Sequence, residues 1–324
     1  GSQWNMISAN MEAAWDQQQT SDTILVAVLD SGVIKEHPDL VSNLNDGIDF
    51  VYGSNDGDPS NPNFTDENPT DETPYNDNSD GSHGTHIAGI IGAVTNNGTG
   101  VAGMSWDIRL LPVRVLNSEQ RGNHYDIAEG IYYSVNSFAQ IINMSFGGEN
   151  SSNTLKEAVE YADSQGSIII SASGNEGNNS VLYPAAYSEV IAVGAVDKNN
   201  KRTDYSNYGS ELDLVAPGGD FNIDNGVFST WGYYDPETED TESGYAYMDG
   251  TSMAAAHVSG AAALLLASDN TLTSSAIKER LTSTAVDLGL EGKDLEYGYG
   301  LIDVYGALID QKLKRPYIFI SEDN

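Results

Sequence analysis

Three side chains that together can perform nucleophilic catalysis stand at the ends of apolar stretches: Asp30, His83 and Ser252. Asp30 follows the apolar run 24–29 and precedes a turn glycine, and ligands collect at the carboxyl ends of parallel strands. His83 begins the stretch His-Gly-Thr-His, where a neutral imidazole can act as a general base near pH 7. Ser252 opens an apolar helix predicted over 252–267, where free peptide N–H groups and the helix dipole favour a developing oxyanion. These residue types therefore suit a serine nucleophile with a histidine base.

Each of these residues also has a purely structural interpretation. Asp30 alone more often caps the next turn, and Ser252 alone is an ordinary helix N-cap residue. His86 lies one turn beyond the candidate base in an apolar helix, so we expect it to be packed. His257 lies about 140° around the helix from Ser252 and cannot easily reach it. Two further histidines, in loop-like contexts without such a motif, are His37 and His124.

An amide donor for an oxyanion is found after another apolar run, 167–171, in the sequence Gly174-Asn175-Glu176-Gly177. The Asn175 amide can hold the carbonyl oxygen of a tetrahedral intermediate. Gly-Asn is also a common turn, so this signal is weak by itself. The serine motif is not the G-x-S-x-G elbow of the α/β-hydrolases, which argues against an esterase of that kind.

The elements that must position these residues alternate along the chain. Continuously apolar runs predict buried parallel strands, and helical patterns lie between them. The predicted strands are 24–29, 108–115, 141–144, 167–171 and 190–193, and the predicted helices are 86–94, 125–138, 155–164, 252–267, 276–281 and 302–309. The fold class is therefore α/β, with a doubly wound, mostly parallel central sheet and helices on both faces. We predict one catalytic domain over 1–324.

Acidic residues dominate the charge, with 48 Asp and Glu against 14 Lys and Arg, a net charge of −34. Such a surface repels nucleic acid and anionic membranes, so neither is an expected partner. Calcium binding, adaptation to high salt and a generic acidic secreted protein all remain open. The segment 46–80 holds ten acids and no Lys or Arg, and acids also crowd 232–244. We predict acidic surface-loop insertions near 52–80 and 232–244.

The chain contains no cysteine, so disulfides and a thiolate nucleophile are excluded.

Taken together, the motifs Asp30-Ser-Gly, His83-Gly-Thr-His and Gly-Thr-Ser252-Met-Ala resemble those of the subtilisin-like serine proteases, the subtilases. The order of these residues along the chain, Asp30, His83 and Ser252 with Asn175 between the histidine and the serine, also resembles the order in the subtilases. The resemblance runs from about Trp4 to Ala307. It implies that Ser252 is the nucleophile, that His83 is its base, that Asp30 orients the imidazole and that Asn175 donates to the oxyanion.

The resemblance also implies a substrate cleft that binds an extended peptide by strand addition. One wall is implied at Ser145-Phe146-Gly147 and the opposite wall around Arg121-Gly122. The implied substrate-binding residues are Ser145, Phe146, Gly147, Gly122, Ala172, Gly174 and Leu182. Leu182 stands where a smaller residue is common, so we expect a shallow apolar S1 pocket and broad specificity with an apolar P1 preference. Glu176 at its rim is expected to tolerate a basic P1 residue.

Structural Ca²⁺ is the cofactor that the resemblance implies, with oxygen ligands of the kind this ion prefers. The ligands of the first site are Asp39, Val94, Asn97, Thr99 and Val101, where the alternative is a simple Gly/Asn turn. A second site is hypothesised from Asp49, Asp56 and Asp58. Because Gln3 stands at the very start of the resemblance, we expect the family's extra N-terminal ligand to be missing.

One departure lies in the catalytic helix, where Ala256 occupies the place of the family's usual proline. A helix without that proline runs straighter, which leads to the hypotheses of a transpeptidation-prone variant or a catalytically weak, subtilase-fold binding protein. The expected partners are protein and peptide substrates and the protein's own propeptide, acting as intramolecular chaperone and inhibitor. We further expect a secreted, extracellular monomer.

Overall fold

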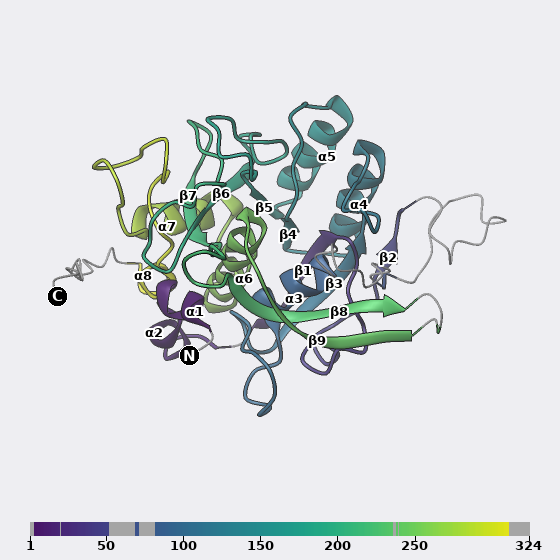
Figure 1. Ribbon diagram of the computed structural model, residues 1–324. Coiled ribbons are helices and arrows are strands. Elements are labelled where there is room, and N and C mark those ends of the chain that lie inside the picture. The colour runs from purple at the N-terminus through teal and green to yellow at the C-terminus, as the bar shows by residue number, and fades with distance from the viewer. Residues whose placement is uncertain are drawn as a thin grey trace.

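Seven parallel strands form the central sheet of the computed structural model, in the order β2-β3-β1-β4-β5-β6-β7 (Figure 1). The structure describes residues 3–19, 21–51, 69–70, 82–235, 238 and 240–310. The strands are β1 (Ser21–Asp30), β2 (Ile48–Asp49), β3 (Ile108–Arg114), β4 (Ile141–Met144), β5 (Ile168–Ala172), β6 (Val190–Val196) and β7 (Leu214–Pro217). Strands β4 to β7 are buried at every position, as expected when both faces of a parallel sheet are covered. The predicted doubly wound fold is confirmed.

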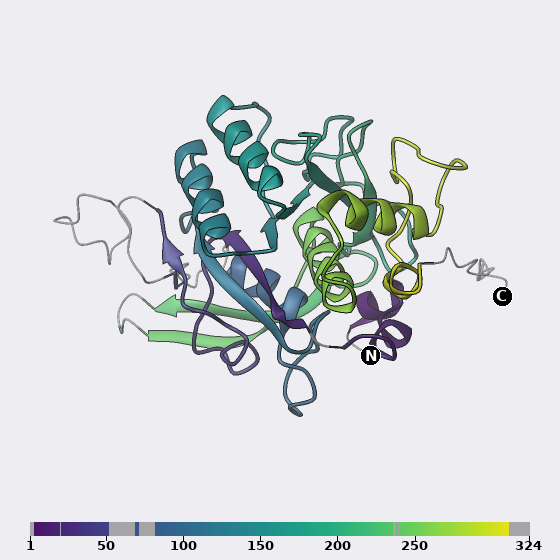
Figure 2. The same ribbon diagram turned by 180° about the vertical axis from the view of Figure 1, so that it is seen from behind.

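Helices cover both faces of this sheet (Figures 1 and 2). Those on one face are α4 (His124–Asn136) and α5 (Asn153–Ser164), and those on the other are α3 (His83–Gly92), α6 (Thr251–Ser268) and α7 (Ser274–Thr284). Three short helices, α1 (Trp4–Ser8), α2 (Met11–Trp15) and α8 (Val304–Leu308), complete the described set. Alternate residues of β1 enter two cores: Val26 and Val28 pack toward α3 and α6, whereas Ala27 and Leu29 pack toward α4 and α5.

An antiparallel hairpin of β8 (Val227–Asp235) and β9 (Asp240–Met248) crosses the end of the sheet beside α3 (Figure 1). The predicted acidic loop at 232–244 is therefore wrong, because most of that segment is paired strand. Aromatic residues on either side of the acids supply cross-strand contacts, such as Phe228 with Tyr247 at a ring-centroid distance of 4.7 Å. The other predicted insertion, near 52–80, lies outside the described residues except for 69–70.

Side-chain hydrogen bonds join this hairpin to the first turn of α3. The Thr230 hydroxyl donates to the Thr85 carbonyl oxygen at 2.6 Å, and the Ser229 hydroxyl donates to the His86 carbonyl oxygen at 2.9 Å. A side chain at Gly89 would collide with the Thr230 hydroxyl, so this close packing requires glycine. The hairpin is thus fixed directly beside His83.

The helix α6 is apolar around its whole circumference and lies in the core. Its length and composition would suffice to cross a membrane, but 89% of it is buried inside the protein. It runs without interruption through Ala256, as the replacement of a proline by alanine predicts. Ser252 lies in its first turn, so the burial of α6 fixes the position of the candidate nucleophile.

Candidate active site

A short hydrogen bond joins the first two candidate residues. Asp30 ends β1 and is fully buried, and the His83 ring at the start of α3 donates from Nδ1 to Asp30 Oδ1 at 2.7 Å. The Ser31 amide donates to the same carboxylate oxygen at 2.8 Å. A side chain at Gly84 would collide with the Gly32 carbonyl oxygen, so glycine lets α3 approach β1 this closely. With Nδ1 protonated and bound, the neutral imidazole presents Nε2 as its basic atom.

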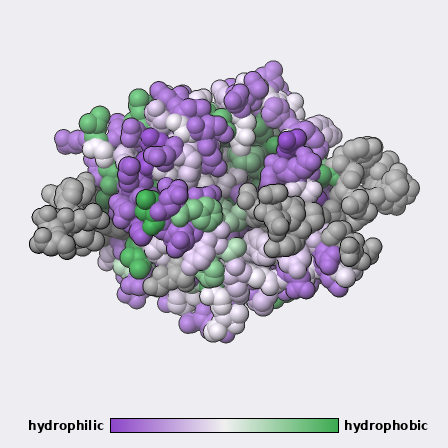
Figure 3. Space-filling model, viewed as in Figure 1, coloured by the Kyte–Doolittle hydropathy of each residue, from purple (hydrophilic) through white to green (hydrophobic). Residues whose placement is uncertain are grey.

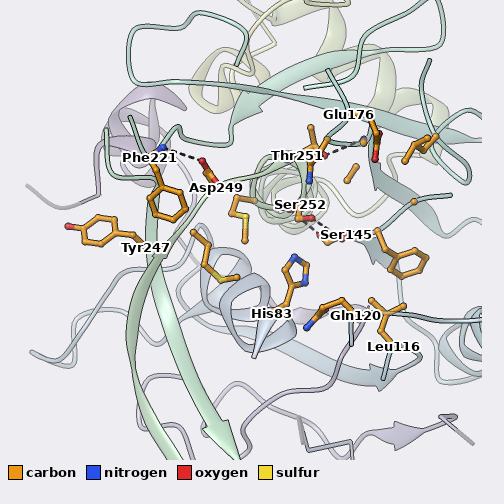
Figure 4. Close-up of a pocket in the computed structure, with 18 of the residues that line it drawn as sticks. His83, Leu116, Gln120, Ser145, Glu176, Phe221, Tyr247, Asp249, Thr251 and Ser252 are labelled. Carbon is orange, nitrogen blue, oxygen red and sulfur yellow. Dashed lines mark hydrogen bonds between the residues drawn. The ribbon is translucent and has the colours of Figure 1, made fainter. Parts of the chain in front are cut away.

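The hydroxyl of Ser252 faces this imidazole across the cleft (Figure 4). Ser252 Oγ donates to the Ser145 carbonyl oxygen at 2.9 Å, and Ser145 Oγ donates in return to the Ser252 carbonyl oxygen at 3.1 Å. The serine proton is therefore held by the main chain in this rotamer. This reciprocal pair also ties the first turn of α6 to the segment that follows β4.

The amide of Asn175 is oriented by its neighbour Thr251. Asn175 Oδ1 accepts from the Thr251 amide at 3.0 Å and from the Thr251 hydroxyl at 2.8 Å. Because both donors engage the oxygen, the NH₂ group is left to face the cleft that Asn175 lines with Ser252. An oxyanion formed on a carbonyl bound to Ser252 would find a donor here.

These residues share a cleft of about 540 Å³ at the carboxyl ends of the strands. Of the predicted substrate-binding residues, the cleft brings together Ser145, Phe146, Gly147, Ala172, Gly174 and Leu182. Gly122 does not line it; the residues of the same loop that do are Leu116 and Gln120. Gly122 instead lies against the Val115 carbonyl oxygen, which a side chain there would contact at 2.6 Å.

Sequence reasoning missed the wall that comes from the hairpin and the loop before it. The lining residues of this wall are Phe221, Trp231, Ala246, Tyr247, Met248 and Asp249. The available signal was the β-favouring aromatic and threonine content of 228–234 and 245–247, on either side of the acids at 235–242. The density of acids favoured a loop instead.

Two glycines and a leucine shape the end of the cleft that the resemblance assigns to the P1 side chain. A side chain at Gly147 would lie 2.8 Å from Leu182 Cβ, and one at Gly174 would lie 2.7 Å from Leu182 Cγ. Leu182 thus forms an apolar floor, and both glycines keep the space above it open. The Glu176 carboxylate stands at the rim and accepts from Asn207 Nδ2 at 2.6 Å.

The remaining histidines have structural partners. His86 donates from Nε2 to the Val227 and Ala246 carbonyl oxygens at 3.1 and 3.2 Å, and burial lowers its pKa to about 3. His257 donates from Nδ1 to the Met253 carbonyl oxygen, and burial lowers its pKa to about 4. The prediction that His86 is a packed residue is confirmed, and His257 is fully buried as well. The other two are His37, which is buried under Gly244, and His124, which begins α4 at the surface.

The residues predicted for the first calcium site meet around the buried carboxylate of Asp39. Asn97 Nδ2 donates to Asp39 Oδ1, and the Val101 amide donates to Oδ2 at 2.9 Å. The Thr99 amide donates to Asn97 Oδ1 at 2.9 Å, and the Val94 amide donates to the Asp39 carbonyl oxygen at 2.7 Å. Within the described ranges no Lys or Arg pairs with Asp39. In the described structure both oxygens of this fully buried carboxylate accept from N–H donors of the loop, and the described residues hold no group of three or more acidic or histidine side chains that could hold a metal ion.

The N-terminal residue Gln3 also reaches this loop. Its amide donates to the Ala102 carbonyl oxygen at 2.8 Å and accepts from the Ala102 amide at 2.9 Å. These bonds join Gln3 to main-chain atoms of the loop, and the expectation that the family's N-terminal calcium ligand is missing stays a prediction. Nothing in the local sequence of either segment signals a contact between residues 99 positions apart.

The second hypothesised calcium site is not supported at Asp49. Arg114 Nη1 lies 2.6 Å from Asp49 Oδ2, and both side chains are buried. The guanidinium already balances this carboxylate, and its positive charge opposes a cation at the same place. Asp56 and Asp58 lie outside the described residues.

A buried aspartate, a histidine that it orients and a serine across a cleft, set on a doubly wound sheet, define a serine hydrolase of the Asp-His-Ser chain order. A family model described as the subtilase family matches residues 21–300, and the chain belongs to this family. It is a serine endopeptidase by this membership and by its relatives.

Relatives are similar over most of the chain. A subtilisin of Bacillus pumilus is 39% identical over 300 residues, which cover 91% of this chain and 94% of the relative. A thermophilic serine proteinase of a Bacillus species is 38% identical, and the match covers 95% of this chain and 67% of the relative. Halolysin of Haloferax mediterranei is 41% identical, covering 95% of this chain and 53% of halolysin. A solved protease structure from Pseudoalteromonas arctica aligns with a TM-score of 0.84 at 35% identity. The alignment covers 95% of this chain and 97% of the solved chain.

Proposed function

We propose that this protein hydrolyses peptide bonds through an acyl-enzyme on Ser252. Ser252 Oγ attacks the scissile carbonyl carbon while His83 Nε2 takes the hydroxyl proton, and Asp30 stabilises the resulting imidazolium. The Asn175 NH₂ group and the Ser252 amide donate to the oxyanion. His83 then gives its proton to the leaving amine, and water repeats the sequence to release the acid. The observation that carries this proposal is the 2.7 Å contact between His83 and Asp30 facing Ser252 in one cleft.

Substrate binding is proposed to occur between the segments Ser145–Gly147 and Leu116–Gln120, which line opposite sides of the cleft. An extended peptide would pair mainly with main-chain groups, which supports broad specificity. The apolar floor at Leu182 supports a preference for apolar P1 side chains of moderate size. Glu176 at the rim supports tolerance of a basic side chain there.

A structural Ca²⁺ is proposed at the Asp39 loop, held by Asp39, Asn97 and main-chain carbonyl oxygens of the predicted residues. The ion would neutralise the buried carboxylate and fix the loop to the rest of the fold. Its role is stabilising, because Asp39 is not among the residues that line the cleft.

The partners and location are proposed from the family. Protein substrates follow from the subtilase membership. An extracellular monomer, assisted and inhibited by its own propeptide, remains a proposal. The rival hypotheses of a silent binding protein and of a transpeptidation-prone variant are not favoured, because a relative is named a serine proteinase and His83, Asn175 and Ser252 line one cleft, with Asp30 bound behind His83.

The nucleophile is tested by labelling with a fluorophosphonate, followed by peptide mapping, beside cleavage of an unstructured protein. We expect the native protein to be labelled at Ser252 and Ser252→Ala to be neither labelled nor active. Ser164→Ala, which changes an exposed serine at the end of α5, serves as the matched control. A folded native protein that cleaves substrate with Ser252 unlabelled would overturn the proposal.

A further inference from the structure

Polar side chains gather on the surface of this protein, and the face in Figure 3 is mostly hydrophilic. Asn143 and Ser259 are exceptions, because both side chains are fully buried. Asn143 lies in β4, between β1 and β5, where every position is buried and the other three residues are apolar. Ser259 lies on the buried helix α6. A buried polar group lowers stability unless it is hydrogen-bonded, so the bonds that these two residues make indicate what they do.

The hydrogen bonds of Asn143 and Ser259 lead to the candidate nucleophile. Ser259 Oγ donates to Asn143 Oδ1 at 2.8 Å, and Asn143 Nδ2 donates to Ser145 Oγ at 2.9 Å. Ser145 Oγ donates in turn to the Ser252 carbonyl oxygen at 3.1 Å. We call this row of hydrogen bonds, from Ser259 through Asn143 and Ser145 to Ser252, the polar chain. All four residues are buried, so bulk water does not compete for these bonds.

Every proton in the polar chain has one direction. A carbonyl oxygen can only accept, so the Ser145 hydroxyl must donate to Ser252. The oxygen of that hydroxyl then accepts, which requires the NH₂ group of Asn143 to face Ser145. The amide oxygen of Asn143 therefore faces Ser259, whose hydroxyl must donate. Removing Asn143 would remove the donor that fixes the Ser145 side chain and would allow its hydroxyl to adopt another rotamer.

The polar chain joins the helix that carries the nucleophile to the strand that leads to the cleft wall. Ser252 and Ser259 are seven residues apart, about two turns, and so lie on one side of α6. Asn143 and Ser145 are two residues apart, so both side chains can point toward that helix. Ser252 Oγ also donates to the Ser145 carbonyl oxygen at 2.9 Å (Figure 4). These bonds fix the nucleophile relative to the segment that is proposed to bind the substrate main chain.

We propose that Asn143 is a positioning residue for the nucleophile, acting through the Ser145 hydroxyl, and that Ser259 orients its amide; this inference rests on the proposed function. Attack requires Ser252 Oγ at the right distance and angle from a carbonyl held beside Ser145, and a misplacement of about 1 Å can cost about 10²-fold in rate. Loss of the polar chain should lower kcat and change KM little, because the main-chain groups of the cleft wall remain.

The test is a double-mutant cycle on kcat for a peptide p-nitroanilide, with each protein standardised by the amount that a fluorophosphonate labels. Asn143→Leu and Ser145→Ala are each expected to lower kcat about tenfold, with KM within about twofold of the native value. If Asn143 acts through Ser145, the double variant loses no more than Ser145→Ala alone, whereas independent effects would multiply to about a hundredfold. Ser259→Ala should lower kcat about threefold, because it removes one hydrogen bond further from the nucleophile. If Asn143→Leu does not fold, Ser259→Ala takes its place in the cycle.

Ser134→Ala is the matched control. The Ser134 hydroxyl is fully buried and donates to the Gly130 carbonyl oxygen at 2.7 Å within α4, on the other face of the sheet. This variant should lower the free energy of unfolding in urea as the others do and yet keep the native kcat.

A native kcat in the folded Asn143→Leu and Ser259→Ala variants, or losses that multiply in the double variant, would overturn the positioning role. The native protein tests the proposed function separately. If it hydrolyses the p-nitroanilide and the variants match it, only the positioning role fails; if it hydrolyses neither this substrate nor an unstructured protein, the proposed function fails too.

Discussion

Replacing Asn175 tests the oxyanion site most directly. Thr251 donates two hydrogen bonds to the side-chain oxygen of Asn175 and so orients the amide, whereas the NH₂ group is the part that would donate to the oxyanion. In Asn175→Ala the NH₂ donor is lost while the cleft stays open. Removing one such donor typically costs about 10²–10³ in kcat, or about 3–4 kcal/mol of transition-state stabilisation. KM should change little, since the donor acts on charge that develops only in the transition state.

Asn175→Asp sharpens this prediction. The Thr251 amide and hydroxyl, at 3.0 and 2.8 Å, would still donate to one carboxylate oxygen and keep the side chain in place. The second oxygen would then put a negative charge where the NH₂ group now faces the cleft. Two like charges about 4 Å apart repel by about 4 kcal/mol at an effective dielectric constant of 20. Asn175→Asp should therefore have a lower kcat than Asn175→Ala.

The assay is the steady-state hydrolysis of a peptide p-nitroanilide, with kcat and KM determined for each variant. Asn178→Ala, an exposed asparagine three residues away, is the control and should leave both constants near their native values. A kcat for Asn175→Ala within about fivefold of the native value, where a loss of about 10²–10³ is expected, would refute the role of this donor. Equal kcat values for the Ala and Asp variants would refute the charge argument.

Three further outcomes follow from the structure. Asp39→Asn should abolish the rise in melting temperature that Ca²⁺ gives the native protein, measured by calorimetry with EDTA and with added Ca²⁺. Because burial lowers the pKa of His257 to about 4 from an ordinary 6.5, the unfolded chain takes up more protons between these values, and stability falls as the pH falls through this window. In urea unfolding, His257→Gln should reduce the fall in the free energy of unfolding between pH 6.5 and 5. His124→Gln, a change at the surface, should leave this fall as it is in the native protein. Arg114→Met removes the buried guanidinium that balances the charge of Asp49 and should cost about 3–5 kcal/mol in the same assay.

The catalytic constellation could be predicted because its residues sit in local motifs at the ends of apolar segments. The strand β4 is predicted with its observed bounds, since the apolar residues Ile141, Ile142 and Met144 stand between polar flanks. Helix α3 begins at His83 rather than His86, because the glycine and threonine that follow His83 weaken the helical pattern without preventing the helix.

What could not be predicted depends on contacts between distant segments. The pairing of Asp49 with Arg114, 65 residues apart, follows from the neighbouring positions of β2 and β3, which no spacing rule reveals. The contact of Gln3 with Ala102 is of the same kind. The hairpin was not predicted because its acidic composition is typical of a loop. Asp240 and Glu242 are exposed, and the strands are stabilised by packing of β8 on α3, which the local sequence does not indicate.

The burial of α6 has a kinetic consequence. A nucleophile carried on the first turn of a helix that is 89% enclosed exists only in the complete fold, because this apolar helix has no stable place outside the core. An unfolded copy is thus inert as an enzyme but is an extended substrate for any folded copy. Self-digestion should then be bimolecular, so that the half-life of a stored sample shortens as the protein concentration rises.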